Sequence, residues 1–239
     1  MKELIPQVDL SKRKSKIIAI EGFDAVGKHT QSMKLKKHLE DKGLNVGNIS
    51  LPDYAEASAV LIDLWLKRYY NVNNAYHIAS LYAINRFNAI YYNSKVLNSI
   101  ANDDVFIFDR YVGSNILYTM GLLDTLKEKG EFCDFLRKYE HGLLKLPEPD
   151  VVIFLDLYPE TAHRMCVNRA KNEGRVIDEN EDLKFQKQCY ENKEFLRLFY
   201  PNTIMIDCNT YDESGRPVSI LTADEISEKV LESVLPYLQ

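Results

Sequence analysis

The sequence predicts an α/β domain in three layers, with a five-stranded parallel sheet between two layers of helices. Five short runs rich in Val, Ile and Phe are spaced along the chain, and segments with helical spacing of apolar residues lie between them. The runs show no clean alternation of polar and apolar residues, as is typical of strands that helices cover on both faces. Strands that alternate with helices form parallel sheets, so a parallel sheet is expected here.

The predicted strands cover, in chain order, residues 16–21, 46–51, 105–109, 151–156 and 203–208. The helical pattern after the first strand covers residues 28–42 and ends at Gly43, which suits a left-handed helix terminus. A long helix is expected over residues 74–100. The largely charged segment 169–182 predicts a short mobile lid, with the solvated end of a helix as the alternative. Residues 209–219 form an unusually long loop before the last helix, without a functional interpretation.

Length and composition point to one globular domain. The chain has 239 residues, of which 46% are hydrophobic and 27% are charged, which is typical of a protein with a sizeable core. We expect a loosely attached arm over residues 1–15 and a single domain over residues 16–239. The net charge of -5 predicts no broad attraction to nucleic acid, so an anionic ligand needs a local cluster of cations.

The cysteines and the apolar segments bear on where the protein works. The four cysteines have no C-x-x-C spacing, which argues against a zinc site or a redox motif and favours buried free thiols. No apolar stretch approaches the length that spans a bilayer. We therefore expect a cytoplasmic protein in a reducing compartment, with no membrane partner.

The strongest local motif is GFDAVGKHT at residues 22–30, between the first strand and the first helix. It matches the phosphate-binding pattern G-x-x-x-x-G-K, in which glycines let backbone N–H groups point at phosphate oxygens and Lys28 reaches the β- and γ-phosphates of a nucleotide. A glycine-rich turn with a chance lysine is the alternative. The expected nucleotide-binding residues are Gly22, Ala25, Val26, Gly27, Lys28, His29 and Thr30.

One position departs from this P-loop pattern. His29 stands where Ser or Thr normally holds Mg²⁺. Thr30 lies about 100° further around the helix, so it does not simply take over that role. Magnesium binding is therefore expected to depend more on carboxylates and on bridging water.

Beyond this loop the chain contains further segments, which are LPDY at 51–54, LYAINR at 81–86, DRYVGSNILY at 109–118 and LPEPDVVIFLDL at 146–157. Together with EGFDAVGKHTQ, their order and spacing resemble the thymidylate kinases (dTMP kinases), a family of P-loop nucleoside monophosphate kinases. The resemblance extends over residues 16–199. It implies a P-loop NTPase fold, ATP and Mg²⁺ as cofactors, and phosphorylation of thymidine 5′-monophosphate (TMP). It also implies a homodimer, for which the helical stretch 75–100 offers a surface.

The segment DRYVGSNILY is the most discriminating of these. It begins at the carboxyl end of the third strand, where open α/β sheets place their ligands. Asp109 can orient the water shell of a metal ion, and Arg110 offers a planar fork of donors to phosphate oxygens. A surface ion pair between Asp109 and a lysine is the alternative. The resemblance implies that Arg110 bridges the donor and acceptor phosphates during transfer.

The resemblance also implies an acceptor site. Asn115, with Ser114 beside it in the motif, would bind the edge of thymine, and Tyr118 would stand against the sugar 2′ position and disfavour ribonucleotides. Tyr82 would stack on thymine, and Arg86, one helical turn away, would donate to the base. Packing in a core is the alternative for both tyrosines.

Two further residues belong to the implied acceptor site. Tyr54 lies in the loop after the second predicted strand. Related enzymes place an arginine or a tyrosine of this loop against the acceptor phosphate. Asp24 matches an acidic position near the sugar 3′-hydroxyl and the phosphates, with stabilisation of the turn as the alternative.

Phosphoryl transfer needs alignment and positive charge more than covalent help. The phosphate-binding loop contains no arginine, so the lid is expected to supply the additional charge from Arg169, Lys171 or Arg175. We expect Arg175 to act in catalysis together with Arg169, with the register open by a residue or two. Arg164 resembles a residue that packs on adenine.

Two other functions remain open from the sequence. A kinase for other deoxynucleotides or for deoxynucleosides would keep the fold and change the acceptor, and His29, Asp53 and Thr119 leave room for it. A catalytically silent P-loop binding protein is the second, and His29 is its only support. A silent protein would not need several charged residues that converge on one site, and the chain has four of them, Lys28, Arg86, Asp109 and Arg110.

Overall fold

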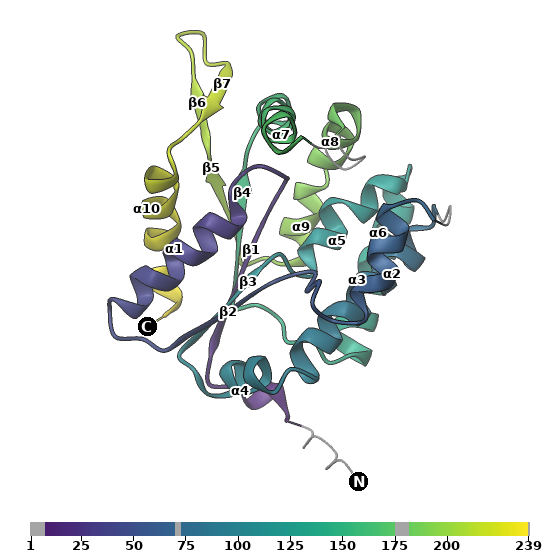
Figure 1. The fold of residues 1–239 in the computed structure, drawn as a ribbon, viewed down its shortest axis with the longest axis vertical. Helices are drawn as coiled ribbons and strands as arrows, with labels where there is room; N and C mark the ends of the chain where they lie inside the picture. Colours follow the sequence, from purple (N-terminus) through teal and green to yellow (C-terminus); the bar gives the residue numbers. More distant parts are fainter. Residues whose placement is uncertain (1–7, 70–72, 175–181, 239) are drawn as a thin grey trace.

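Five parallel strands form the centre of the molecule (Figure 1). The computed structural model describes residues 8–69, 73–174 and 182–238. The sheet has the order β2-β3-β1-β4-β5, with the bounds β1 Lys16–Gly22, β2 Val46–Ser50, β3 Val105–Asp109, β4 Val151–Asp156 and β5 Thr203–Asp207. The central strand β1 pairs in parallel with β3 and β4. The predicted strands and the α/β fold class are confirmed.

Helices cover both faces of the sheet (Figure 1). One face is covered by α1 Lys28–Glu40 and α10 Ala223–Val234. The other helices are α2 Ala59–Leu66, α3 Ala75–Tyr91, α4 Ser94–Asn102, α5 Gly113–Leu117, α6 Leu126–Leu136, α7 Pro159–Glu173, α8 Leu183–Tyr190 and α9 Lys193–Phe199. No helix in the part of the chain that the structure describes is long and apolar enough to cross a membrane.

Alternation along the central strands divides the core into two clusters. Ile17 and Ala19 of β1 pack with Phe108 of β3 against the face that α3, α4, α5 and α9 cover. Ile18 and Ile20 point the other way, toward α1 and α10. Both sets of side chains are buried, which explains why the strand sequences are continuously apolar.

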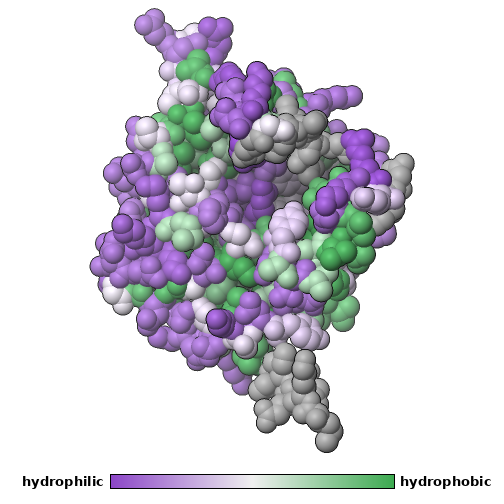
Figure 2. All heavy atoms as spheres, in the orientation of Figure 1, coloured by the Kyte–Doolittle hydropathy of each residue, from purple (hydrophilic) through white to green (hydrophobic). Residues whose placement is uncertain are grey.

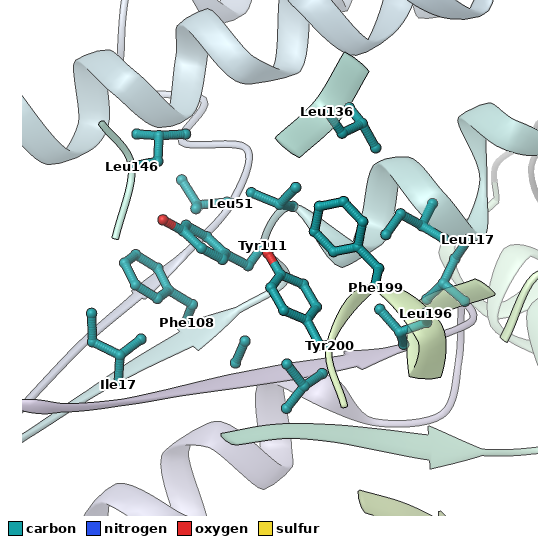
Figure 3. Close-up of a cluster of buried hydrophobic side chains, with 14 of the residues drawn as sticks. Ile17, Leu51, Phe108, Tyr111, Leu117, Leu136, Leu146, Leu196, Phe199 and Tyr200 are labelled. Carbon is teal, nitrogen blue, oxygen red and sulfur yellow. The ribbon is translucent and has the colours of Figure 1, made fainter. Parts of the chain in front are cut away.

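Figure 3 shows the first cluster, where aromatic rings gather beside the end of β3. The rings of Phe108 and Tyr111 stack with their centroids 4.3 Å apart. The Tyr111 hydroxyl donates to the carbonyl oxygen of Pro147 at 2.9 Å. The Phe199 ring packs edge-on against Tyr200 in the same cluster. This packing fixes the backbone just after β3, where the charged residues of the site begin.

The single helix expected over residues 74–100 is wrong, because two helices, α3 and α4, occupy this stretch. The chain leaves helical geometry at Asn93, whose backbone is extended. The Asn93 side chain accepts from the backbone N–H groups of Lys95 and Val96, at 3.2 and 3.3 Å. An asparagine that caps a new helix in this way is compatible with continuous apolar spacing, so periodicity alone does not reveal the break.

The expectation of a loose arm over residues 1–15 is wrong for residues 8–15. Leu10 is buried in the core, and the Ser15 hydroxyl donates to the carbonyl oxygen of Ile100 at 2.6 Å. Arg13 pairs with Asp150 at 2.8 Å. These contacts tie the segment to the amino-terminal edge of the sheet. Residues 1–7 lie outside the described part of the chain.

The long loop expected over residues 209–219 is instead a β-hairpin, with β6 Asn209–Tyr211 and β7 Pro217–Ile220 paired antiparallel. The Asp212 carboxylate organises its turn by accepting from the backbone N–H groups of Ser214 and Arg216, at 2.9 and 3.0 Å. The hairpin projects beyond the end of the sheet (Figure 1).

The lid expected over residues 169–182 is only partly described. Helix α7 continues to Glu173, so residues 169–173 belong to a regular helix. Asp182 caps the next helix, α8, by accepting from the backbone N–H of Phe185 at 3.1 Å. Residues 175–181, including Arg175, lie outside the described residues.

The cap of α4 gives a stability prediction. Replacing Asn93 with Ala leaves two N–H groups without a side-chain acceptor, so the free energy of unfolding should fall by about 1 kcal/mol. The matched control is Asn98→Ala, an exposed position inside the same helix, where the change should stay within about 0.5 kcal/mol. Urea unfolding followed by circular dichroism measures both, and equal losses in the two variants would show that Asn93 is not a cap.

Candidate active site

The predicted phosphate-binding loop lies where the carboxyl end of β1 meets the start of α1. A Cβ built on Gly22, whose φ is +152°, would lie 2.9 Å from the Leu155 carbonyl oxygen on β4, so this position requires glycine. Ala25 and Gly27 have left-handed backbone, with φ of 65° and 87°, which curls the loop so that α1 begins at Lys28. Figure 2 shows a hydrophilic hollow on this face, in the region where Figure 1 places the start of α1.

Lys28 and Arg110 bring two cations to this loop, with Asp24 between them. Lys28 Nζ donates to the Phe23 carbonyl oxygen at 2.7 Å and lies 3.8 Å from Asp24 Oδ1. Arg110 forms an ion pair with the same Asp24 oxygen. Burial alone raises the pKa of Asp24, but the charges of Arg110 and Lys28 outweigh it and bring the pKa to about 2. Burial and the Arg110 charge lower the pKa of Lys28 to about 8. A bound phosphate group would compete with Asp24 for both cations.

Asp109 lies beside this pair at the end of β3. Its Oδ2 accepts from the Ser50 hydroxyl at 2.8 Å and lies 3.4 Å from His29 Nδ1. Within the described residues, no lysine forms an ion pair with Asp109, contrary to the alternative that the sequence left open. A buried carboxylate next to a hydroxyl provides the hard oxygen ligands that Mg²⁺ prefers.

Glu21 joins β1 to the loop after β3, and the sequence analysis missed it. Its buried carboxylate accepts from the backbone N–H groups of Tyr111 and Ser114, at 2.8 and 3.1 Å, and from the Ser114 hydroxyl at 2.6 Å. Burial raises the pKa of Glu21, against the effect of these hydrogen bonds. Arg110, which directly precedes Tyr111, has left-handed backbone with φ of 66°. The available signal was one acidic residue at the end of the apolar run KIIAIE.

Three tyrosines of the predicted acceptor site lie near the charged side chains of Arg110 and Asp24. The guanidinium carbon of Arg110 lies 5.7 Å from the centroid of the Tyr118 ring. Burial raises the pKa of Tyr82, and neighbouring Tyr54 and Asp24 act in the same direction. Tyr54 is 60% exposed. The structure therefore brings residues from four separate segments of the sequence to one place.

Arg86 and Asn115, also expected in the acceptor site, are both held by Glu140. Arg86 donates through Nε and Nη2 to the two oxygens of Glu140, each at 2.7 Å. Asn115 Nδ2 donates to Glu140 Oε1 at 2.9 Å. The charge of Glu140 keeps the pKa of Arg86 raised although burial acts against it. The sequence analysis missed Glu140, because its segment, residues 137–143, contains no motif that points to the site.

Four other predicted residues lie on α1 and α7 and in the phosphate-binding loop. Arg164, on α7, donates to the carbonyl oxygen of Val218 in β7 at 2.7 Å. Thr30 is exposed on α1, and the side chain of Val26 is buried in the core, so only its backbone is available to a nucleotide. Arg169 lies near the end of α7.

A curled glycine loop after a central parallel strand, a lysine at the first position of the following helix and an arginine from the adjacent strand end define a P-loop phosphotransferase. The tyrosines and the paired arginine lie next to this loop, on the side of the sheet where the carboxyl ends of the strands bind ligands in open α/β folds.

Comparison with known proteins assigns this class to a family. The family model described as thymidylate kinase matches residues 20–213. The thymidylate kinase of Mycobacterium tuberculosis is 29% identical over 179 residues, which cover 72% of this chain and 81% of the relative. A putative thymidylate kinase of Invertebrate iridescent virus 6 is 30% identical, with 73% and 74% covered. The chain belongs to the thymidylate kinase family, so the resemblance seen in the sequence is confirmed.

A solved structure shows the same fold. It is described as a thymidylate kinase from Candida albicans with broad substrate specificity and a novel structural element, and it matches with a TM-score of 0.65 at 21% identity. The match covers 94% of this chain and 92% of the other. The three-layer architecture is therefore shared.

The contacts of Glu21 give a prediction that separates hydrogen bonding from charge. Glu21→Ala leaves two buried backbone N–H groups unpaired and should lower the free energy of unfolding by about 3 kcal/mol. Glu21→Gln keeps a carbonyl oxygen that accepts from those groups, so its loss should be less than about half as large. Urea unfolding at neutral pH measures both variants. Equal losses would mean that the hydrogen bonds to the backbone do not explain why this residue is buried.

Proposed function

We propose that this chain transfers the γ-phosphoryl group of ATP to TMP, giving thymidine diphosphate. The observation that carries the proposal is a cluster in which Lys28 and Asp24 of the phosphate-binding loop meet Arg110, just after β3. Membership of the thymidylate kinase family supports the choice of acceptor. Relatives that carry this name are 27% to 30% identical to the chain.

Catalysis rests on positioned charge. Lys28 exchanges the Phe23 carbonyl for the β- and γ-phosphates, and Arg110 exchanges Asp24 for phosphate oxygens of donor and acceptor. Both cations lie next to the same Asp24 oxygen, so they are close enough to act on neighbouring phosphate groups. The reaction needs no general base, because a phosphate oxygen of TMP is already anionic at neutral pH. Closure over the site excludes water and thereby suppresses hydrolysis of ATP.

On the acceptor side, each residue has a physical role. Tyr82 stacks on thymine, and the Tyr118 ring stands against the sugar 2′ position, where a hydroxyl would clash or lose its solvent. Tyr54 contacts the acceptor phosphate, and Asp24 lies near the sugar 3′-hydroxyl. Ser114 keeps its hydrogen bonds to Glu21 and supports this side of the site through the backbone.

The residues near the loop fit a magnesium ion. Mg²⁺ is usually held by one or two carboxylates together with substrate phosphates and waters. Asp109, with Ser50 beside it, would hold the ion's water shell, and His29 would take no part as an oxygen ligand. A bound magnesium ion would neutralise negative charge on the transferred phosphates.

The remaining cations belong to the donor side in our proposal. Arg175, together with Arg169 at the end of α7, supplies charge to the transferred group, because the phosphate-binding loop has no arginine of its own. Arg164 packs on the adenine ring. Its present partner, the carbonyl of Val218, lies in the hairpin, so the hairpin borders the adenine side of the site.

The state of the cysteines supports a reducing, cytoplasmic location in this proposal. All four cysteines are free, and three of them, Cys166, Cys189 and Cys208, are buried. Burial raises the pKa of Cys133 to about 11, and the pKa values of Cys189 and Cys208 to about 12. None of these thiols forms a disulfide that an oxidising compartment would favour.

The acceptor assignment is tested by ADP formation with ATP and Mg²⁺, comparing TMP with dUMP, dCMP, dGMP, UMP and thymidine. TMP should give the highest kcat/KM. Lys28→Ala should lower kcat at least about a hundredfold, because a charge that stabilises the transition state is lost. The control is Lys37→Ala, an exposed lysine on the same helix, which should keep wild-type activity. Preference for another acceptor would discard TMP, and no turnover with any acceptor would discard the kinase.

We also propose a homodimer that uses α2 and α3. Apolar side chains of these helices are exposed, and they are Val60, Leu61, Leu66 and Ile84. Figure 2 shows hydrophobic surface on the right of the view, where Figure 1 places α2 and α3. Exposed apolar side chains that gather on one side of a molecule are typical of an interface.

Sedimentation of the purified protein tests the dimer. The wild type should sediment at twice the chain mass of 27.7 kDa. Ile84→Glu, at a residue that is 40% exposed on α3, should give monomers, because it would bury a charge at the interface. The control is Leu198→Glu, at a residue that is 76% exposed on α9, which should stay dimeric. A monomeric wild type, or two variants that behave alike, would contradict this interface.

A further inference from the structure

Glu140 is a buried carboxylate that the mechanism above leaves without a role. It lies in the helical segment Arg137–Leu143 and has no exposed surface. Both of its oxygens accept from Arg86, and Oε1 also accepts from Asn115 Nδ2. A buried charge is costly unless it is fully paired. Here both partners are residues of the acceptor side, so the pairing bears on how the acceptor base is held.

The bonds around Asn115 fix the orientation of its amide. Nδ2 donates to Glu140 Oε1 at 2.9 Å and to the Ala79 carbonyl oxygen at 3.3 Å, and both of these partners can only accept. The Thr119 hydroxyl donates to Asn115 Oδ1 at 3.3 Å. With both N–H groups of the amide committed, a ligand meets Asn115 through the second lone pair of Oδ1. Asn115 is therefore an acceptor toward the base.

The bonds around Arg86 make this side chain a fixed donor. Nε and Nη2 form a bidentate pair with Glu140, which sets the plane of the guanidinium group. Nη1 reaches the Tyr111 carbonyl oxygen at 3.4 Å. One N–H on Nη1 and one on Nη2 have no partner among the described residues. Arg86 and Asn115 are only 3% and 2% exposed, so neither side chain is free to reorient while these bonds are in place.

We propose that Glu140 is a positioning residue that sets the preference of the acceptor site for thymine over cytosine. The inference rests on the proposed function. Thymine presents a donor at N3 and an acceptor at O4, whereas cytosine presents an acceptor at N3 and an amino donor at N4. An acceptor at Asn115 and a donor at Arg86 complement thymine and oppose cytosine at both atoms. Glu140 accepts from both side chains and so holds both in this state.

The test is the ratio of kcat/KM for TMP to kcat/KM for dCMP, measured with the full chain. In Glu140→Gln, an amide that both donates and accepts replaces the carboxylate, so the Asn115 amide loses the stronger of the two acceptors that fix its orientation and keeps only the Ala79 carbonyl. The ratio should fall at least about tenfold, which corresponds to about 1.4 kcal/mol. Glu140→Asp keeps the charge and two accepting oxygens, so it should retain a ratio closer to that of the wild type than Glu140→Gln does.

The control is Asp150→Asn, which disrupts the ion pair with Arg13 at the opposite end of the sheet. This variant should lose stability and keep the wild-type ratio. The ratio does not depend on the folded fraction, so reduced yield does not obscure the result. If kcat/KM falls equally for both acceptors in Glu140→Gln, Glu140 is structural and the inference is overturned. A wild type that does not phosphorylate TMP would instead overturn the proposed function.

If Glu140→Gln does not fold, a second comparison replaces it. The double variant Arg86→Gln/Glu140→Gln buries no unpaired charge, and it is compared with Arg86→Gln alone. A lower TMP to dCMP ratio in the double variant supports a role for Glu140 beyond holding Arg86, through the amide of Asn115. Equal ratios in the two chains overturn that role.

Discussion

The buried carboxylate of Glu21 is the constraint on which the site depends. It stands at the end of β1, immediately before the phosphate-binding loop, and its hydrogen bonds hold the backbone on the far side of Arg110. A Cβ on Gly113 would lie 2.8 Å from Glu21 Oε1, so the loop after β3 packs against the carboxylate without room for a larger residue. One side chain therefore links two segments that are distant in sequence, the phosphate-binding loop and the loop that carries Arg110.

The two arginines of the site are paired with carboxylates in different ways. Asp24 is partly exposed, and its pairing with Arg110 leaves both groups at the edge where phosphates bind. Glu140 is fully buried, and its pairing with Arg86 has no route to solvent exchange. In the proposed function, a phosphate group would compete for the first pair, whereas burial would keep the second pair together. The proposed phosphate side is thus the more accessible of the two, and the proposed base side is buried.

The features that the sequence predicted well depend on local physics. Strands covered on both faces leave continuous apolar runs, and the phosphate-binding loop depends on glycines and a lysine that are close in sequence. The break at Asn93 and the hairpin at residues 209–220 depend on side-chain caps and turns that periodicity does not detect. The sequence did not predict Glu140, because its contacts with residues 86 and 115 form only in the folded chain. Arg175 remains a prediction, because it lies outside the described residues.

The burial of the thiols has a practical consequence. Cysteine reagents react with the thiolate, and burial keeps the pKa values of Cys133, Cys189 and Cys208 far above neutral pH. These three thiols are thus poorly reactive toward maleimides and similar probes. A cysteine introduced at Glu213, exposed at the tip of the hairpin, would react much faster than these three. A fluorophore or spin label can therefore be attached at the hairpin without first removing these cysteines.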